Sequence, residues 1–322
     1  MFAKCWTAVG MVVFGLCFGM ARADYPDKPI HVIVPFGPGG TPDVVTRLIG
    51  QRLSERIKQA VVIENRAGAG GGIGTAAGAK AAPDGYTLTI GHVGALTINP
   101  AIYKKLPYQP LVDFAPITLA VTTPLILVVN SSSNIKSVAE LLAAAKATPG
   151  RLTFSSSGNG TASHMAGVLF NSMSGADIVH VPFGSAPAAL TGVAGGDVTF
   201  TFGGQPPAWP LIKAGKLRVL GLTSARRVAE FPDLPAVAEG GVPGYEVLDW
   251  NGFMAPRGTP QEIIERLHRE IAPILRTPEF GSRLREQGLE PVGNSPAEFA
   301  AWIKRESDKW GRVARSINLT LD

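Results

Sequence analysis

Residues 29–48 constrain the fold more than any other part of the chain. Residues 30–34 are mostly β-branched, which predicts a buried strand. The run Gly-Pro-Gly-Gly at 37–40 ends that strand, because glycine tolerates tight turns. Thr41 then fits a helix N-cap, and Pro42 fits the first helical position, where a missing N–H costs nothing. A strand that passes through a glycine loop into a helix is typical of an α/β sheet.

This turn also predicts a binding site for an anion. The start of a helix leaves several backbone N–H groups unpaired around one point. The helix dipole favours an anion there by roughly 0.3–1 kcal/mol, and by up to about 2 kcal/mol when the site is partly buried. Open α/β sheets bind ligands beyond the carboxyl ends of their strands. A plain turn without a ligand is the alternative.

The N-terminus has the pattern of a secretory signal peptide. Lys4 precedes an uncharged apolar run at residues 5–20, and Ala21-Arg22-Ala23 follows. Small residues at these positions predict cleavage after Ala23, so residues 1–23 would be removed. An uncleaved membrane anchor is the alternative, although 16 apolar residues are few for a membrane span. Cleavage would remove both cysteines and leave a chain without disulfides.

Composition excludes several classes of protein. A length of 322 residues suggests about two domains, and 45% apolar with only 17% charged residues excludes extensive disorder. Loss of Lys4 and Arg22 with the signal lowers the net charge from +5 to +3. No run of Lys or Arg argues for nucleic acid. A mildly basic exported protein suits acidic ligands.

The sequence of strand, glycine loop and helix recurs along the chain. Residues 155–161 and 181–187 each lead from a predicted strand to a helix that begins at a capping hydroxyl. Other strands are predicted at 60–63, 86–91, 125–129, 198–202, 216–222 and 250–254. Helical patterns end the chain at 260–275, 278–287 and 296–316. Residues 99–110 are expected to form a long connection.

A second glycine run, at residues 68–74, has some likeness to a dinucleotide fingerprint. The match is weak, because the glycines follow a charged turn and no acidic residue stands at the expected distance. We therefore expect no nucleotide at this loop.

The repeated turns favour two lobes around one cleft. We expect lobe 1 to comprise residues 24–123 and 249–322, and lobe 2 residues 124–248. The chain would cross between them near residues 122–125 and 245–251. Helix N-termini from both lobes would then face the cleft, which suits hinge closure on a small anion.

The sequence does not assemble a catalytic site. The five histidines, His31, His92, His164, His180 and His268, have no metal-ligand spacing. No Gly-x-Ser-x-Gly elbow exists, since the nearest run, 154–158, lacks the first glycine. A Ser157–His164 pair is the remaining alternative. We expect no enzyme activity, no metal and no cofactor.

Several motifs along the chain together resemble those of one known family. The mature sequence resembles the solute-binding proteins of tripartite tricarboxylate transporters, the Bug-type receptors, over nearly its whole length. The matching motifs are YPDKPIHVIVPFGPGGTPD (25–43), VVIENRAGAGGGIG (61–74), FSSSGNGTASH (154–164), VHVPF (179–183), LPAVAEGGVPGYE (234–246) and APRGTP (255–260).

The resemblance implies a type II periplasmic binding protein, with two βα lobes joined by two crossover segments. Such a receptor would capture a small carboxylate in the periplasm, as a monomer, and deliver it to a membrane permease. A ligand sensor that presents its solute to a membrane signalling partner is the alternative.

The resemblance also implies site residues. Phe36, Gly37, Gly39, Gly40 and Asp43 match the first ligand loop, where backbone N–H groups would hold a carboxylate. We expect Asp43 to stabilise the helix dipole or to tie down the loop rather than to touch an anion.

Two further loops complete the expected site. Ser157, Asn159 and Thr161 match the second ligand loop, and Ser185 matches the third. For His164, ligand contact and a helix-capping or partly buried role are both open. The remaining candidates are aromatic: Phe36, Phe183 and Phe202 would wall the pocket or pack in the core.

Two positions depart from the family pattern. Many relatives carry a base where this chain has Gly184, and many carry an acid where it has Gly203-Gly204. Loss of that acid removes a partner for a ligand ammonium. We therefore expect a carboxylate that lacks an amine.

Overall fold

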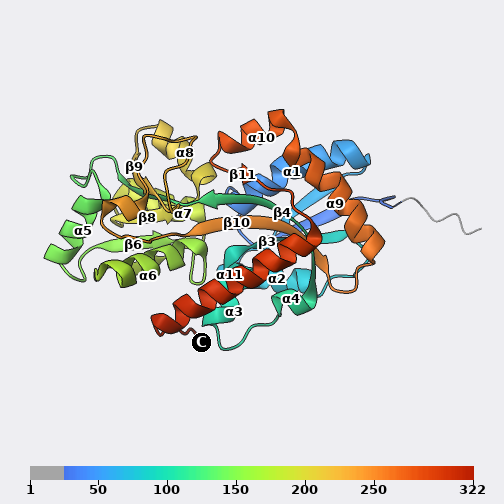
Figure 1. Ribbon diagram of the computed structural model, residues 1–322, viewed down its shortest axis with the longest axis horizontal. Coiled ribbons are helices and arrows are strands. Elements are labelled where there is room, and N and C mark those ends of the chain that lie inside the picture. The colour runs from blue at the N-terminus through green and yellow to red at the C-terminus, as the bar shows by residue number, and fades with distance from the viewer. Residues whose placement is uncertain (1–24) are drawn as a thin grey trace, which may run out of the picture.

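Two β-sheets, joined by a pair of long antiparallel strands, organise the chain (Figure 1). The computed structural model describes residues 25–322. The predicted signal peptide and its cleavage site lie outside the described residues. Among residues 25–322, no helix is both long enough and apolar enough to cross a bilayer.

The first sheet has the strand order β11-β4-β10-β3-β1-β2. Its strands are β1 (Ile30–Val34), β2 (Val61–Asn65), β3 (Thr87–His92), β4 (Phe114–Pro124), β10 (Leu248–Pro256) and β11 (Glu290–Pro291). The strands β1, β2 and β3 are parallel, so their carboxyl ends share one edge. Helices cover both faces (Figure 1): α1 (Thr41–Ile57), α9 (Gln261–Arg276) and α10 (Pro278–Arg285) on one, and α2 (Gly72–Ala79), α3 (Asn99–Ile102), α4 (Pro110–Asp113) and α11 (Pro296–Ser316) on the other.

The second sheet has the order β7-β6-β8-β5-β9. Its strands are β5 (Ile126–Asn130), β6 (Thr153–Ser156), β7 (Val179–Pro182), β8 (Phe200–Gly203) and β9 (Leu217–Leu222). Its helices are α5 (Val138–Ala147), α6 (Ala162–Ser174), α7 (Ala186–Gly195) and α8 (Gln205–Lys213). We call the part built on the first sheet lobe 1 and the part built on the second lobe 2. The predicted α/β fold with two lobes is confirmed.

The chain passes between the sheets at two adjacent places. Strands β4 and β10 pair from Phe114 with Pro256 to Pro124 with Leu248. Where they leave the first sheet, Thr223 holds both segments. Its hydroxyl accepts a hydrogen bond from the Leu125 N–H at 2.8 Å and donates one to the Val247 carbonyl at 2.6 Å. Its backbone also pairs with Leu125 and Val247, so one buried residue ties the crossing segments together.

Several local predictions need correction. Residues 99–110 are not a bare connection, since they contain α3 and the start of α4. Near the predicted crossing at residues 122–125, residues 122–124 are the end of β4, an 11-residue strand that was not predicted because its prolines obscure its pattern. Helix α8 was not predicted, because three of its nine residues are proline.

The cap of α1 also differs from the prediction. The N-cap is Gly40, and Thr41 and Pro42 are the first two helical residues. The Thr41 side chain makes no cap and instead faces Gly204 of lobe 2. The predicted capping hydroxyls of Thr161 and Ser185 are confirmed, since each accepts a hydrogen bond from a first-turn N–H. Ser137 and Ser295 cap α5 and α11 in the same way.

Candidate functional site

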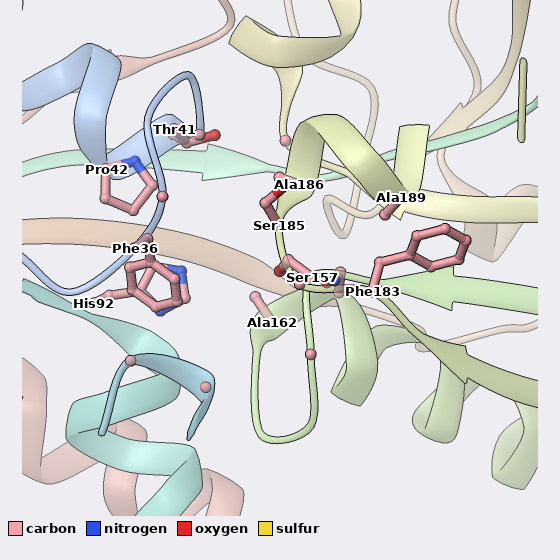
Figure 2. Close-up of a pocket in the computed structure, with 18 of the residues that line it drawn as sticks. Phe36, Thr41, Pro42, His92, Ser157, Ala162, Phe183, Ser185, Ala186 and Ala189 are labelled. Carbon is pink, nitrogen blue, oxygen red and sulfur yellow. Dashed lines mark hydrogen bonds between the residues drawn. The ribbon is translucent and has the colours of Figure 1, made fainter. Parts of the chain in front are cut away.

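A cavity of about 290 Å³ lies between the lobes. Small-molecule sites commonly begin near this size. Lobe 1 contributes loops that follow β1, β2 and β3, and lobe 2 contributes loops that follow β6, β7 and β8. Figure 2 shows Phe36, Thr41, Pro42 and His92 on one side and Ser157, Ala162 and Ser185 on the other. The carboxyl ends of strands from both sheets therefore meet at one cavity.

Four helices begin at this cavity. Gly40 and Thr41 start α1, Ala162 starts α6, Ser185 caps α7, and Gly204 caps α8. Their positive dipole ends and first N–H groups favour a negative ligand. Of the described residues that line the cavity, none is Lys or Arg. Backbone amides and hydroxyls are therefore the means by which this site can hold an anion.

The first loop is held by Asp43. Its carboxylate accepts hydrogen bonds from the Gly39 N–H at 2.9 Å, from Asn65 at 2.9 Å and from Arg47 at 3.0 Å. Burial opposes the charge, but these donors outweigh it and lower the pKa of Asp43. Phe36, Gly37 and Gly40 line the cavity, whereas Gly39 and Asp43 do not. The Gly39 N–H is occupied by Asp43 and is not available to a ligand.

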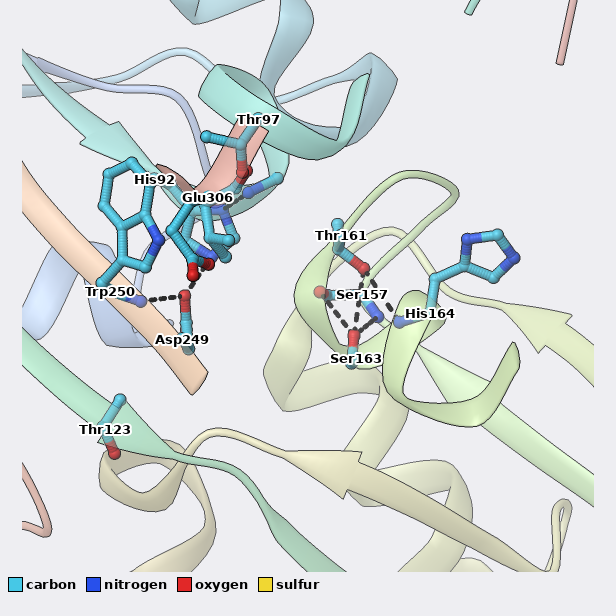
Figure 3. A network of polar contacts seen from close by, with 12 residues as sticks. His92, Thr97, Thr123, Ser157, Thr161, Ser163, His164, Asp249, Trp250 and Glu306 are labelled. Atoms are coloured by element: carbon cyan, nitrogen blue, oxygen red, sulfur yellow. Dashed lines mark hydrogen bonds and ion pairs between the residues drawn. The ribbon is translucent and has the colours of Figure 1, made fainter. Parts of the chain in front are cut away.

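The second loop is organised by hydroxyl groups (Figure 3). The Ser163 hydroxyl accepts from the Ser157 N–H at 3.0 Å and lies 3.1 Å from the Ser157 hydroxyl and 3.0 Å from the Thr161 hydroxyl. Thr161 donates to the Gly158 carbonyl at 2.7 Å. Ser157, Asn159 and Ser163 line the cavity, while Thr161 lies behind them. Sequence reasoning missed Ser163, although it stands in the first turn of α6.

His164 belongs to a different cluster. Figure 3 shows its ring turned away from Ser157. Its Nδ1 accepts from the Gly160 N–H at 3.2 Å, and its ring lies 4.4 Å from that of His180. Burial, with His180 beside it, lowers the pKa of His164 to about 4, and burial lowers that of His180 to about 4. His164 is not among the lining residues, so the structure does not join Ser157 and His164.

The aromatic candidates contribute differently to the wall. Phe36 contacts His92, with 4.6 Å between ring centroids. Phe202 lines the cavity and also packs in the core against Phe170 at 5.7 Å. Phe183 lines the cavity too, but Figure 2 shows its ring directed into lobe 2, away from Phe36. The two predicted roles, lining the pocket and packing in the core, are therefore both found among these phenylalanines.

The glycine run after β2 is part of the site. Residues 67–71 line the cavity, because β2 is parallel to β1 and ends at the same edge. A strand followed by glycines is the sequence signal for this loop, and it lies within the family motif at residues 61–74. Gly70 lies so close to lobe 2 that a Cβ would stand 2.3 Å from the Asn159 carbonyl oxygen. The backbones of the two lobes therefore contact each other here, so the cleft between the lobes is closed.

A buried His–Asp pair was also missed. His92 Nε2 at the end of β3 lies 2.9 Å from Asp249 Oδ1 of β10, and both residues line the cavity. Only the position of His92 at a strand end signalled a site. The expected lack of an amine rested on the absence of an acid at residues 203–204. Asp249 supplies an acid from another strand, so that expectation loses its basis.

Comparison with known proteins agrees with this geometry. Residues 45–319 match the family model described as "Tripartite tricarboxylate transporter family receptor". The chain is 35% identical to Protein BugT of Bordetella pertussis, over 95% of this chain and 94% of that protein.

Solved structures of similar proteins include two with ligands named in their descriptions. Rpa4515 of R. palustris with adipate is 37% identical, with a TM-score of 0.90 over 92% of this chain and 99% of that one. MatC (Rpa3494) from Rhodopseudomonas palustris with bound malate is 31% identical, with a TM-score of 0.84 over 90% of this chain and 99% of that one.

Proposed function

Because the chain belongs to the tripartite tricarboxylate transporter receptor family of periplasmic solute-binding proteins, we propose that it captures a small organic carboxylate between its lobes and delivers it to the membrane permease of such a transporter. It would be exported by the N-terminal signal, cleaved after Ala23, and would work in the periplasm as a monomer. No chemical change in the ligand is part of this role.

One observation carries the proposal. Helix N-termini from both lobes, α1 on one side and α6, α7 and α8 on the other, surround a cavity whose described lining contains no Lys or Arg. An anion would complete both halves at once, because each lobe supplies N–H groups that the other lacks. Ligand binding would therefore stabilise the closed cleft. The adipate and malate of the two similar structures are carboxylates, which supports this ligand class.

The site residues we propose fall into two groups. Phe36, Gly37, Gly40, Ser157, Asn159, Ser163 and Ser185 would touch the ligand, with Phe183 and Phe202 in the wall. Gly39, Asp43, Thr161 and His164 would shape the loops from behind.

Calorimetry on mature protein with a wide panel of organic acids tests the proposal. We expect saturable binding by at least one carboxylate, and native mass spectrometry of protein purified from periplasm should reveal a retained acid. A folded protein that releases no heat with any acid of the panel would contradict it.

A gene deletion tests the delivery step. It should abolish uptake of the bound acid, whereas loss of induction with normal uptake would indicate the sensor role instead.

A further inference from the structure

The charge of the cavity wall is unusual for a carboxylate site. Of the described residues that line it, Asp249 is the only acid, and no Lys or Arg balances it. Asp249 is only 4% exposed, so its charge is poorly screened by solvent. Its partner, His92, is 5% exposed.

The protonation of His92 is fixed by the backbone. The Gly94 N–H donates to His92 Nδ1 at 2.9 Å, so Nδ1 is an acceptor and carries no hydrogen. Nε2 then carries the single ring proton and lies 2.9 Å from Asp249 Oδ1. The ring is therefore neutral, and the pair places one full negative charge in the wall of the cavity.

One oxygen of Asp249 takes all the hydrogen bonds. Oδ1 accepts a hydrogen bond from the Trp250 N–H at 2.8 Å and lies 2.9 Å from His92 Nε2. Within residues 25–322, Oδ2 has no hydrogen-bond partner. An acceptor left open at the wall of a ligand cavity can take a hydrogen bond from a donor on the ligand.

We propose that Asp249 makes the cleft select a monocarboxylate that carries a hydrogen-bond donor, a hydroxyl or an ammonium, at its other end, and disfavour a second ionised carboxylate. This rests on the proposed function, since the helix N-termini are taken to hold the first carboxylate. Apolar side chains in the wall, among them Leu125 and Phe202, suit a carbon chain between the two ends.

Two matched ligand series test the selection at pH 7. The six-carbon series is 6-hydroxyhexanoate, 6-aminohexanoate, hexanoate and adipate. The four-carbon series is 4-hydroxybutyrate, 4-aminobutyrate, butyrate and succinate. In the series that fits, calorimetry should show the hydroxy or amino acid binding about tenfold or more tighter than the dicarboxylate, as one hydrogen bond to a charged group implies. A dicarboxylate that binds more tightly than its matched hydroxy and amino acids would overturn the inference.

A single substitution should reverse the order. In Asp249→Asn, the amide oxygen can accept from His92 and Trp250 while the NH₂ group replaces Oδ2, so an acceptor becomes a donor. The variant should prefer the dicarboxylate over the amino acid by about tenfold. Asp197→Asn, at an exposed turn after α7, removes the same charge and should leave the order unchanged. An order that Asp249→Asn leaves unchanged in folded protein would overturn the inference.

The results separate this inference from the proposed function. If the protein binds other organic acids but no member of either series, the inference fails and the proposed function stands. If it binds no organic acid, both fail. If Asp249→Asn does not fold, the order of the wild-type series decides alone.

Discussion

A methyl group on Gly204 of lobe 2 would stand 2.2 Å from the Thr41 hydroxyl oxygen of lobe 1. The backbone of Gly204 lies at φ −67° and ψ 145°, an extended conformation that any residue adopts, so alanine would be unstrained within its own lobe. The absence of a side chain at this position therefore serves the contact between the lobes.

Gly204→Ala should hold the cleft partly open. Overpacking of a tight contact costs about 1–3 kcal/mol, and we expect the affinity for the ligand to fall by a corresponding amount. Calorimetry measures the loss, and small-angle scattering of the liganded protein should show a less compact form. Unchanged affinity would mean that Thr41 rotates away at no cost.

A second variant isolates the cause of that loss. Thr41→Ala removes the hydroxyl that the new methyl group would meet. If the clash is responsible, the double variant should bind better than the sum of the two single effects predicts. Strictly additive effects would assign the loss to something other than this contact.

Thr161→Val should loosen the second ligand loop. The Thr161 hydroxyl caps α6 and donates to the Gly158 carbonyl at 2.7 Å, so its loss should cost about 0.5–2 kcal/mol of stability. Urea unfolding measures this cost, and ligand affinity should fall with it. Thr161→Ser keeps the hydroxyl and is the control. A fall in affinity at unchanged stability would show instead that Thr161 contacts the ligand directly.

The paired histidines of lobe 2 should make the fold sensitive to acid. Burial lowers the pKa values of His164 and His180 from 6.5 to about 4. Between these limits the unfolded chain binds protons that the folded protein does not, so stability is full above pH 6.5 and falls as the pH drops towards 4. Each histidine contributes up to about 1.4 kcal/mol per pH unit to the slope of the free energy of unfolding against pH. Urea midpoints across this range measure it.

His180→Gln should reduce that slope. Glutamine can still meet the Ser156 hydroxyl, which lies 2.7 Å from His180 Nε2, but it cannot titrate. His31→Gln, which replaces an exposed histidine on β1, is the matched control. An equal slope in His180→Gln and the wild type would remove His180 from the explanation.

Sequence alone predicted the parts of this fold that follow local rules. The strand pattern at residues 30–34 and the capping hydroxyls of Ser137, Thr161 and Ser185 act within a few residues of the chain. Strand β4 was missed because burial in the sheet outweighs the prolines in its sequence.

The missed parts of the site depend on contacts between distant segments. His92 and Asp249 are 157 positions apart and meet only because β3 and β10 pair in the sheet. The Gly39 N–H was expected to face a ligand, but Asp43, four residues later, takes it. Such competition for a donor depends on side-chain direction, which spacing does not reveal.

Thr223→Val tests the link between the crossing segments. The substitution keeps the shape of the side chain but leaves the buried Leu125 N–H and Val247 carbonyl without its hydroxyl. Each unsatisfied buried group costs about 1–3 kcal/mol, so for two groups we expect a loss of about 2–6 kcal/mol in the free energy of unfolding. Thr223→Ser retains the hydroxyl and should lose much less. Thr223 itself is not among the described lining residues, although its partner Leu125 is, so the substitution removes no side chain from the cavity wall. An affinity change in folded Thr223→Val would therefore report on how the crossing segments set the balance between open and closed lobes. A stability equal to that of the wild type would show that the Thr223 hydroxyl is not needed to hold the two segments together.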